Sequence, residues 1–289
     1  EFNRMAVSVL KAMCSAVVLA VTLTACGGSG PEVKTQALAV PLEGVTEARV
    51  ELAPRIEHLT INRAPDDFDQ LFAAEAQYIG DLAFDAGGGD SPTISLSEPT
   101  PSLTNLGSTL RWDVMISRGV PVALLADIGS GGATFHLNDL QLTELDVTSS
   151  SGGTSIFLPV TEWALPVRWD GGSGEMRLTI PAGANVELHS LSLGSGAYTL
   201  DFAGDARFNG SFVGGAGAIN IDISEGIATR LEVLEIGSGG IEVPGWLTRI
   251  TGDELDNFGV WQTADYADAS DHINLIFEST GSGRVSVRW

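Results

Sequence analysis

Positive charge, cysteine and histidine are all scarce in this chain, and each scarcity narrows the possible functions. The 289 residues include 15 Lys and Arg against 37 Asp and Glu, which gives a formal net charge of −22. A protein that binds nucleic acid nonspecifically presents a basic surface to the phosphates, so the sequence excludes such a binder. Hydrophobic residues form 44% and charged residues only 18% of the chain. This balance excludes intrinsic disorder, which combines few apolar residues with many charges.

The only two cysteines, Cys14 and Cys26, lie in an N-terminal segment with the composition of a secretion signal. Lys11 supplies a positive charge, and residues 12–22 form a mostly apolar stretch. That stretch is shorter than the roughly 20 residues that a membrane span needs. We expect residues 1–25 to be a signal peptide that is cleaved after Ala25. With Cys26 lipidated, the mature chain would keep no thiol for disulfides, redox chemistry or thiolate–metal binding.

The residues Leu23-Thr24-Ala25-Cys26 resemble a bacterial lipobox. The resemblance implies that the Cys26 sulfur carries diacylglycerol and that the chain is anchored to a membrane outside the cytoplasm, in the bacterial cell envelope. Two or three acyl chains hold a protein stably where one does not. Residues 26–44 are then the lipidated cysteine and a flexible tether, because residues 27–41 are small, polar and free of aromatic side chains. An ordinary signal peptide with an incidental cysteine is the alternative.

Glycine is abundant, and it recurs in Gly-x-Gly turns at a nearly fixed interval. Successive turns are 21 or 22 residues apart, except for a last step of 44 that suggests a coil without its marker near Trp261. The final glycines of these turns are Gly131, Gly152, Gly174, Gly196, Gly217, Gly239 and Gly283. Apolar and polar residues alternate after each turn, as in Met176, Leu178 and Ile180. A period of two predicts strands with one buried face.

One strand pair every 21–22 residues predicts an all-β fold, a single β-solenoid of roughly eleven coils over residues 45–289. A glycine is expected at one corner of each coil because a positive φ costs it little. A β-sandwich of hairpins is the main alternative, and a leucine-rich repeat fits poorly because its asparagine ladder is missing. Helical spacing is nearly absent; residues 68–76 come closest, and they are equally compatible with a loop or a strand edge.

Several of these segments resemble the toast-rack domains, bacterial domains of unknown function. The resemblance lies in Leu110-Arg111-Trp112-Asp113-Val114, Val120-Pro121-Val122, Asp127-Ile128-Gly129-Ser130-Gly131 and the ending from Trp261 to Val287. Such domains are similar to the C-terminal domain of membrane proteins of the cell-wall-antibiotic response and to adhesin-like proteins. The resemblance covers residues 45–289. It implies a non-enzymatic scaffold for envelope interaction, adhesion or stress sensing, and it carries over no catalytic residue.

Three acidic clusters are the candidates for a calcium site or for the acid/base pair of a glycan lyase or hydrolase. They are Asp66, Asp67 and Asp69; Asp253, Glu254 and Asp256; and Asp265, Asp268 and Asp271. A solvated acidic surface is the alternative, and none of the clusters has the spacing of an EF-hand. We therefore expect no catalytic residue, no cofactor and no metal.

Histidine and tryptophan are the remaining candidates. His58, His136, His189 and His272 fall in different coils and lack the spacing of a metal site. Trp163 and Trp169 are close enough in sequence to form a stacking surface for a sugar; the alternative is that the six tryptophans fill the core and cap the ends. The expected partner is a protein or a glycan of the envelope.

Overall fold

The computed structural model describes residues 21–24, 32–99, 110–252 and 258–289, and these residues form strands and no helix. In chain order the strands are β1 (Val21–Thr24), β2 (Lys34–Pro41), β3 (Ala48–Ala53), β4 (His58–Arg63), β5 (Gln70–Tyr78), β6 (Ala83–Ala86), β7 (Thr93–Ser97), β8 (Arg111–Ile116), β9 (Val122–Gly129), β10 (Gly132–His136), β11 (Leu142–Ser149), β12 (Thr154–Phe157), β13 (Leu165–Gly171), β14 (Met176–Ile180), β15 (Asn185–Ser192), β16 (Tyr198–Phe202), β17 (Arg207–Val213), β18 (Ile219–Ile223), β19 (Ala228–Val233), β20 (Gly240–Glu242), β21 (Thr248–Thr251), β22 (Gly259–Gln262), β23 (His272–Ser279) and β24 (Arg284–Arg288). The all-β prediction is confirmed.

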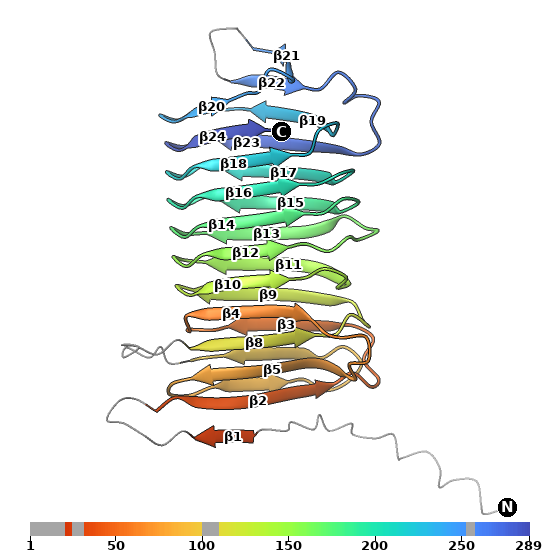
Figure 1. Cartoon of the computed structure of the whole chain (residues 1–289), viewed down its shortest axis with the longest axis vertical. Helices are drawn as coiled ribbons and strands as arrows, with labels where there is room; N and C mark the ends of the chain where they lie inside the picture. Colours follow the sequence, from red (N-terminus) through yellow and green to blue (C-terminus); the bar gives the residue numbers. More distant parts are fainter. Residues whose placement is uncertain (1–20, 25–31, 100–109, 253–257) are drawn as a thin grey trace, which may run out of the picture.

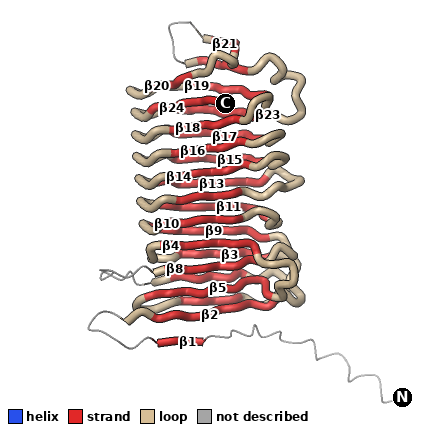
Figure 2. The backbone as a smooth tube through the Cα atoms, viewed as in Figure 1, coloured by secondary structure: helices blue, strands red, loops and turns tan. Residues whose placement is uncertain are grey.

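The strands build two 12-stranded sheets whose rungs stack along one axis (Figures 1 and 2). Sheet A has the order β1-β2-β5-β8-β4-β10-β12-β14-β16-β18-β24-β20, and sheet B has the order β21-β22-β19-β23-β17-β15-β13-β11-β9-β3-β7-β6. From β9 to β18 the chain alternates between the sheets, so that each coil adds one strand to each. Neighbouring strands in this stretch are parallel. This arrangement is the predicted β-solenoid.

The core consists of inward side chains that repeat from coil to coil. In sheet A, Met176 lies opposite Tyr198, and Leu178 lies opposite Leu200. These four side chains are 1–2% exposed or less, and they join inward residues of sheet B in one apolar cluster. The inward side chains of each coil contact those of the coils on either side. The alternation that is visible in the sequence therefore becomes a continuous core.

The marker glycines stack directly on one another, and this contact explains why they are glycines. A Cβ at Gly174 would collide with the main-chain oxygen of Gly152, and a Cβ at Gly196 would collide with that of Gly174. None of the marker glycines from Gly131 to Gly283 has a positive φ. For these final glycines the predicted reason was therefore wrong, because the requirement is the close approach of backbone from the adjacent coil. It holds for Gly129 and Gly281, which begin two of the same turns and have φ values of 64° and 60°.

Positive φ angles occur at the opposite corner, where the chain leaves sheet A for sheet B. The residues are Asp139, Gly183, Gly204 and Gly226, one in each of four coils, with φ between 55° and 88°. These residues end short turns such as the one after Ile180. Positive φ is therefore the reason for glycine at Gly183, Gly204 and Gly226, whereas close backbone approach is the reason at the final glycines of the Gly-x-Gly turns.

Coils at both ends of the stack do not follow the order of the sequence. The final coil, β23 and β24, lies between β17/β18 and β19/β20, so Gly283 stacks on Gly217 and Gly239 stacks on Gly283. At the other end, β7 and β8 lie outside β3 and β4. The predicted markerless coil near Trp261 is wrong, because β22 there pairs antiparallel with β19 and β21. The count of eleven coils stays a prediction, since antiparallel end strands belong to no complete coil.

Two N-terminal segments complete the comparison with the sequence. Residues 70–78, which include most of the stretch that was compatible with a helix, a loop or a strand edge, form strand β5 between β2 and β8. Strand β2 lies inside residues 26–44, the expected tether, and buries Leu38 and Val40 in the core. The tether prediction is therefore wrong for residues 34–41. The alternation places Leu38 and Val40 on the inward face of a strand, and the edge of this strand pairs with β5.

Candidate functional surface

The outer face of sheet A carries two regular rows of side chains, all of them polar except Phe157. One row contains Thr60, Thr134, Ser155, Arg177, Thr199, Asn220 and Ser286, and its neighbour contains Asn62, His136, Phe157, Thr179, Asp201, Asp222 and Arg288. The strands are parallel, so residues in a row repeat at the spacing of adjacent strands, about 4.8 Å. The result is a long polar surface with a fixed repeat.

An ion network lies at the C-terminal part of this face. The Arg177 Nε lies 2.7 Å from the Asp201 Oδ2, and the Arg288 Nη2 lies 3.0 Å from the Asp222 Oδ2. The hydrogen bond from Arg288 is the main cause that lowers the pKa of Asp222, and burial opposes it. Arg288 belongs to the inserted coil, so the pair fastens β24 to β18.

The outer face of sheet B is hollowed over β3, β7, β9 and β11, with a volume of about 400 Å³ that is open to solvent. Glu51, Asp127 and Asp146 line it. An arginine meets each of these acids: Arg49 Nε lies 2.7 Å from Glu51, Arg55 Nη2 lies 3.3 Å from Asp127, and Arg168 Nη1 lies 3.5 Å from Asp146. The carboxylates are thus neutralised by neighbours, which disfavours a cation site here.

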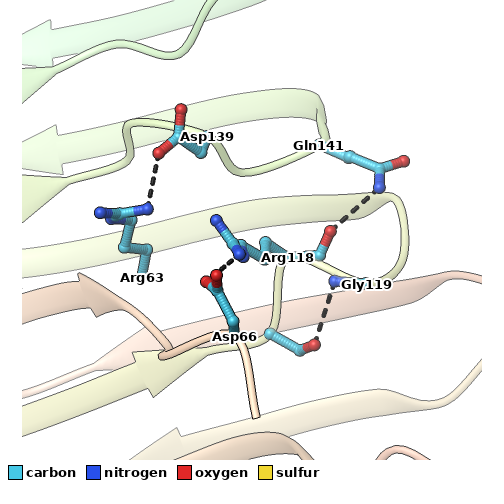
Figure 3. A network of polar contacts seen from close by, with 7 residues as sticks. Arg63, Asp66, Arg118, Gly119, Asp139 and Gln141 are labelled. Atoms are coloured by element: carbon cyan, nitrogen blue, oxygen red, sulfur yellow. Dashed lines mark hydrogen bonds and ion pairs between the residues drawn. The ribbon is translucent and has the colours of Figure 1, made fainter. Parts of the chain in front are cut away.

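A second polar network ties together the corner where β4, β8 and β10 end (Figure 3). The Arg63 Nη1 lies 2.6 Å from the Asp139 Oδ2, and Arg118 pairs with Asp66. The Gln141 side chain donates to the Arg118 carbonyl at 2.9 Å. These contacts connect three stacked coils, including the coil that lies outside its sequence order.

The two acidic clusters that the structure describes do not converge on one site. Asp66 is paired with Arg118, and Asp69 accepts a hydrogen bond from Gln70. Asp271 pairs with Arg207 at 3.4 Å. The cluster of Asp253, Glu254 and Asp256 lies outside the described residues. Among residues that are described, no group of three or more His, Cys, Asp and Glu could hold a metal ion.

The histidines are also dispersed. His58, His136 and His189 are exposed on β4, β10 and β15, and His272 begins β23. His136 stacks on Phe157 with ring centroids 5.2 Å apart, and His272 packs edge-on against Tyr266. The imidazole rings of His136 and His272 therefore have packing roles.

The predicted tryptophan pair is not a shared surface. Trp169 is 2% exposed and points into the core, whereas Trp163 is 42% exposed and lies in the turn between β12 and β13. The Trp163 Nε1 donates to the Leu142 carbonyl at 3.0 Å. Trp112 is fully buried, and Trp246 stacks on Trp289 near the C-terminal end. The alternation of β13 directs Trp169 inward, so Trp163 and Trp169 do not form a shared surface for a sugar.

Sequence reasoning missed one buried acid, Glu98, which follows β7. It is 3% exposed, and neither carboxyl oxygen forms a hydrogen bond. Burial raises its pKa to about 7, although the Arg55 main-chain N–H and guanidinium lie close enough to oppose the shift. The signal was present in the sequence, because Glu98 continues the inward phase of Ile94 and Leu96.

The lipidation and cleavage residues, Cys26 and Ala25, lie outside the described residues. Immediately before them, β1 pairs antiparallel with β2, from Val21 opposite Ala37 to Thr24 opposite Lys34. In the described part of the chain, no helix has the length and apolar character to cross a membrane.

Comparison with known proteins adds a family and two similar structures. The family model for the N-terminal domain of toast_rack, DUF2154, matches residues 29–179. A putative cell adhesion protein from Clostridium sporogenes ATCC 15579 shares 13% identity at a TM-score of 0.46, over 88% of this chain and 98% of that one. A putative adhesin from Bacteroides fragilis NCTC 9343 shares 9% identity at a TM-score of 0.38, over 90% and 100%. No curated protein sequence matches the chain.

Proposed function

Because the chain belongs to the toast-rack family, we propose that it is a lipid-anchored, non-enzymatic scaffold of the bacterial cell envelope. It offers its outer faces to an envelope partner in adhesion or stress sensing. The polar rows of sheet A carry the proposal. A surface of mostly polar side chains at a fixed spacing suits an extended partner, because each coil presents contacts at the same interval.

A scaffold role fits the chemistry of the described residues better than catalysis. General acid–base catalysis by two carboxylates needs one acid held protonated and one left ionised beside a substrate cleft. The three acids of the hollow on sheet B are each paired with an arginine. Glu98, whose pKa is raised, lies in the core and has no access to a substrate.

The position of β2 supports an anchor with a short tether. Residues 27–33 separate Cys26 from the start of β2. At roughly 3.4 Å a residue, these residues span at most about 25 Å. A lipid on Cys26 would therefore hold the N-terminal end of the solenoid close to the membrane, with the rest of the stack leading away from that end.

Fatty-acid labelling tests the anchor. Cells that express the full chain are grown with an alkyne-tagged fatty acid, and the label on the purified protein is measured. The wild type and Cys14→Ser are expected to carry the label, whereas Cys26→Ser is expected to lose it. Label on Cys26→Ser, or none on the wild type, would contradict lipid anchoring at Cys26.

Photo-crosslinking in intact cells tests the scaffold role. A photoreactive amino acid is placed at Thr199, which faces outward on sheet A, and at Leu200, its buried neighbour. We expect the Thr199 position to give one discrete adduct with an envelope component and the Leu200 position to give none. The proposal fails if outward positions along both sheets give no adduct.

A further inference from the structure

Strand β1 occupies the outermost position of sheet A, and it lies within the segment that we propose to be removed. It pairs with β2 through Val21–Ala37, Thr22–Gln36, Leu23–Thr35 and Thr24–Lys34, at the β1 end of the stack in Figure 1. Cleavage after Ala25 would take β1 away. The inner edge of β2 would stay paired with β5 from Lys34 to Pro41, so β2 would remain in place with its outer edge uncovered.

The freed edge would differ from the three other sheet edges. Those edges are β20, β21 and β6, which have only three or four residues each. Each also carries a charge, Glu242, Arg249 or Asp85. Short length and charged side chains are the usual means of keeping sheet edges from pairing. Strand β2 has eight residues, with Lys34 at one end and no acidic side chain.

We propose that signal cleavage exposes the outer edge of β2 and that a second copy of this chain pairs with it. This inference rests on the proposed processing after Ala25. Two β2 strands would run antiparallel across a two-fold axis, which joins sheet A of both copies into one continuous sheet. A two-fold interface requires the same surface on both partners, and a strand edge meets this condition when the pairing is antiparallel.

The strand β1 itself shows which geometry the edge accepts. It binds β2 in an antiparallel register over four residues, and a second β2 offers an antiparallel strand of up to eight residues. Charge favours the same partner. The chain has a net charge of −22, so most faces of two copies repel each other. The sequence Lys34-Thr35-Gln36-Ala37-Leu38-Ala39-Val40-Pro41 brings no acid to the contact.

The tether permits such a dimer at one membrane. The proposed lipid sites precede the two β2 strands by residues 27–33, a length of at most about 25 Å each. In an antiparallel pair of eight-residue strands, the two Lys34 ends are roughly 24 Å apart. Both anchors can therefore insert near the dimer axis, in the same leaflet.

Crosslinking of the full chain in cell membranes tests the proposal. Ala37 is replaced by cysteine in a Cys14→Ser background, and a short bismaleimide is added. Ala37 is exposed and lies in the middle of β2, so the two introduced thiols come close. Ala197→Cys is the matched control, since Ala197 is equally an exposed alanine but belongs to a distant coil. We expect a band at twice the monomer mass for Ala37→Cys and not for Ala197→Cys.

A second measurement uses the otherwise unmodified chain in detergent. Light scattering is expected to give a dimer for the wild type and Ala197→Asp, and a monomer for Ala37→Asp, which places two like charges at the interface. The mass of each purified protein shows whether residues 1–25 are present.

The outcomes separate the two proposals. A processed, lipidated protein that stays monomeric, or that crosslinks through Ala37→Cys only to a protein of another mass, overturns the dimer and leaves the anchor intact. A protein that retains residues 1–25 without lipid overturns the anchor, and with it the exposure of the edge.

Discussion

At the scale of single residues, the stack depends on places where no side chain can be accommodated. Glycines at the corner between sheet B and sheet A repeat because the main chain of one coil rests on the main chain of the next. The spacing of these glycines was readable from the sequence. Their physical reason was not, since a positive φ and a close backbone approach select the same residue.

Alanine at a stacked glycine tests this explanation. We expect Gly196→Ala to lower the free energy of unfolding by about 3 kcal/mol, because its Cβ would force the adjacent coil away. Gly240→Ala is the control, since a Cβ there meets no atom within 4 Å. Urea denaturation followed by circular dichroism measures both. Equal stability of the two variants would mean that the backbone contact is not required.

Glu98 should make stability fall as the pH rises. Its pKa is raised from 4.5 to about 7 in the fold. The folded state therefore retains a proton that the unfolded state loses, so stability is full below about pH 4.5 and declines through pH 7. Glu98→Gln should have little effect near pH 4.5 and should stabilise the protein by up to about 3 kcal/mol near pH 8. Denaturation at both pH values measures this difference, and an equal effect at both would show that Glu98 does not titrate there.

At the scale of elements, the strands follow from the sequence and their order in the sheets does not. Alternation predicted β14, β16, β18 and β24 with their inward residues, because period two is a local property. The insertion of β23 and β24 between earlier coils depends on pairing between strands that are far apart in the sequence. The 22-residue period favours Gly239 as the neighbour of Gly217, whereas Gly283 stacks there and Gly239 stacks on Gly283.

The pair between Arg288 and Asp222 should help to hold the inserted coil. Replacing Arg288 by glutamine is expected to lower the melting temperature and to speed hydrogen exchange in β24 and β20. The pKa of Asp222 is lowered from 3.8, so this contribution is present above about pH 4 and is lost as the pH falls through the lowered pKa. Arg284→Gln is the control, because Arg284 is an exposed arginine at the other end of β24 and does not lie opposite Asp222. Equal exchange rates in both variants would contradict the role of the pair.

At the scale of the whole molecule, the predicted β-solenoid was confirmed. Several residues that the sequence offered as candidates for calcium binding, acid–base chemistry or sugar binding have structural roles instead. Within the described residues, Asp66 and Asp271 of the acidic clusters form ion pairs, and Trp169 fills the core. Sequence patterns identified these residues by type, but pairing with arginine depends on which coils become neighbours. Arg118 and Asp66 meet only because β8 lies beside β4.

The order of the coils is the claim that can be tested most directly. In the full chain with Cys14 and Cys26 replaced by serine, cysteines are introduced at Asn220 and Ser286 or at Asn220 and Glu242. Asn220 lies opposite Ser286, and Glu242 lies one strand further along. Neighbouring strands are about 4.8 Å apart, within the roughly 4.4–6.8 Å that Cα atoms of a disulfide span, whereas two strands over is about 9.6 Å. Mild oxidation should join Asn220→Cys to Ser286→Cys and leave Asn220→Cys with Glu242→Cys reduced. A disulfide in the second pair and none in the first would show that the coils stack in the order of the sequence.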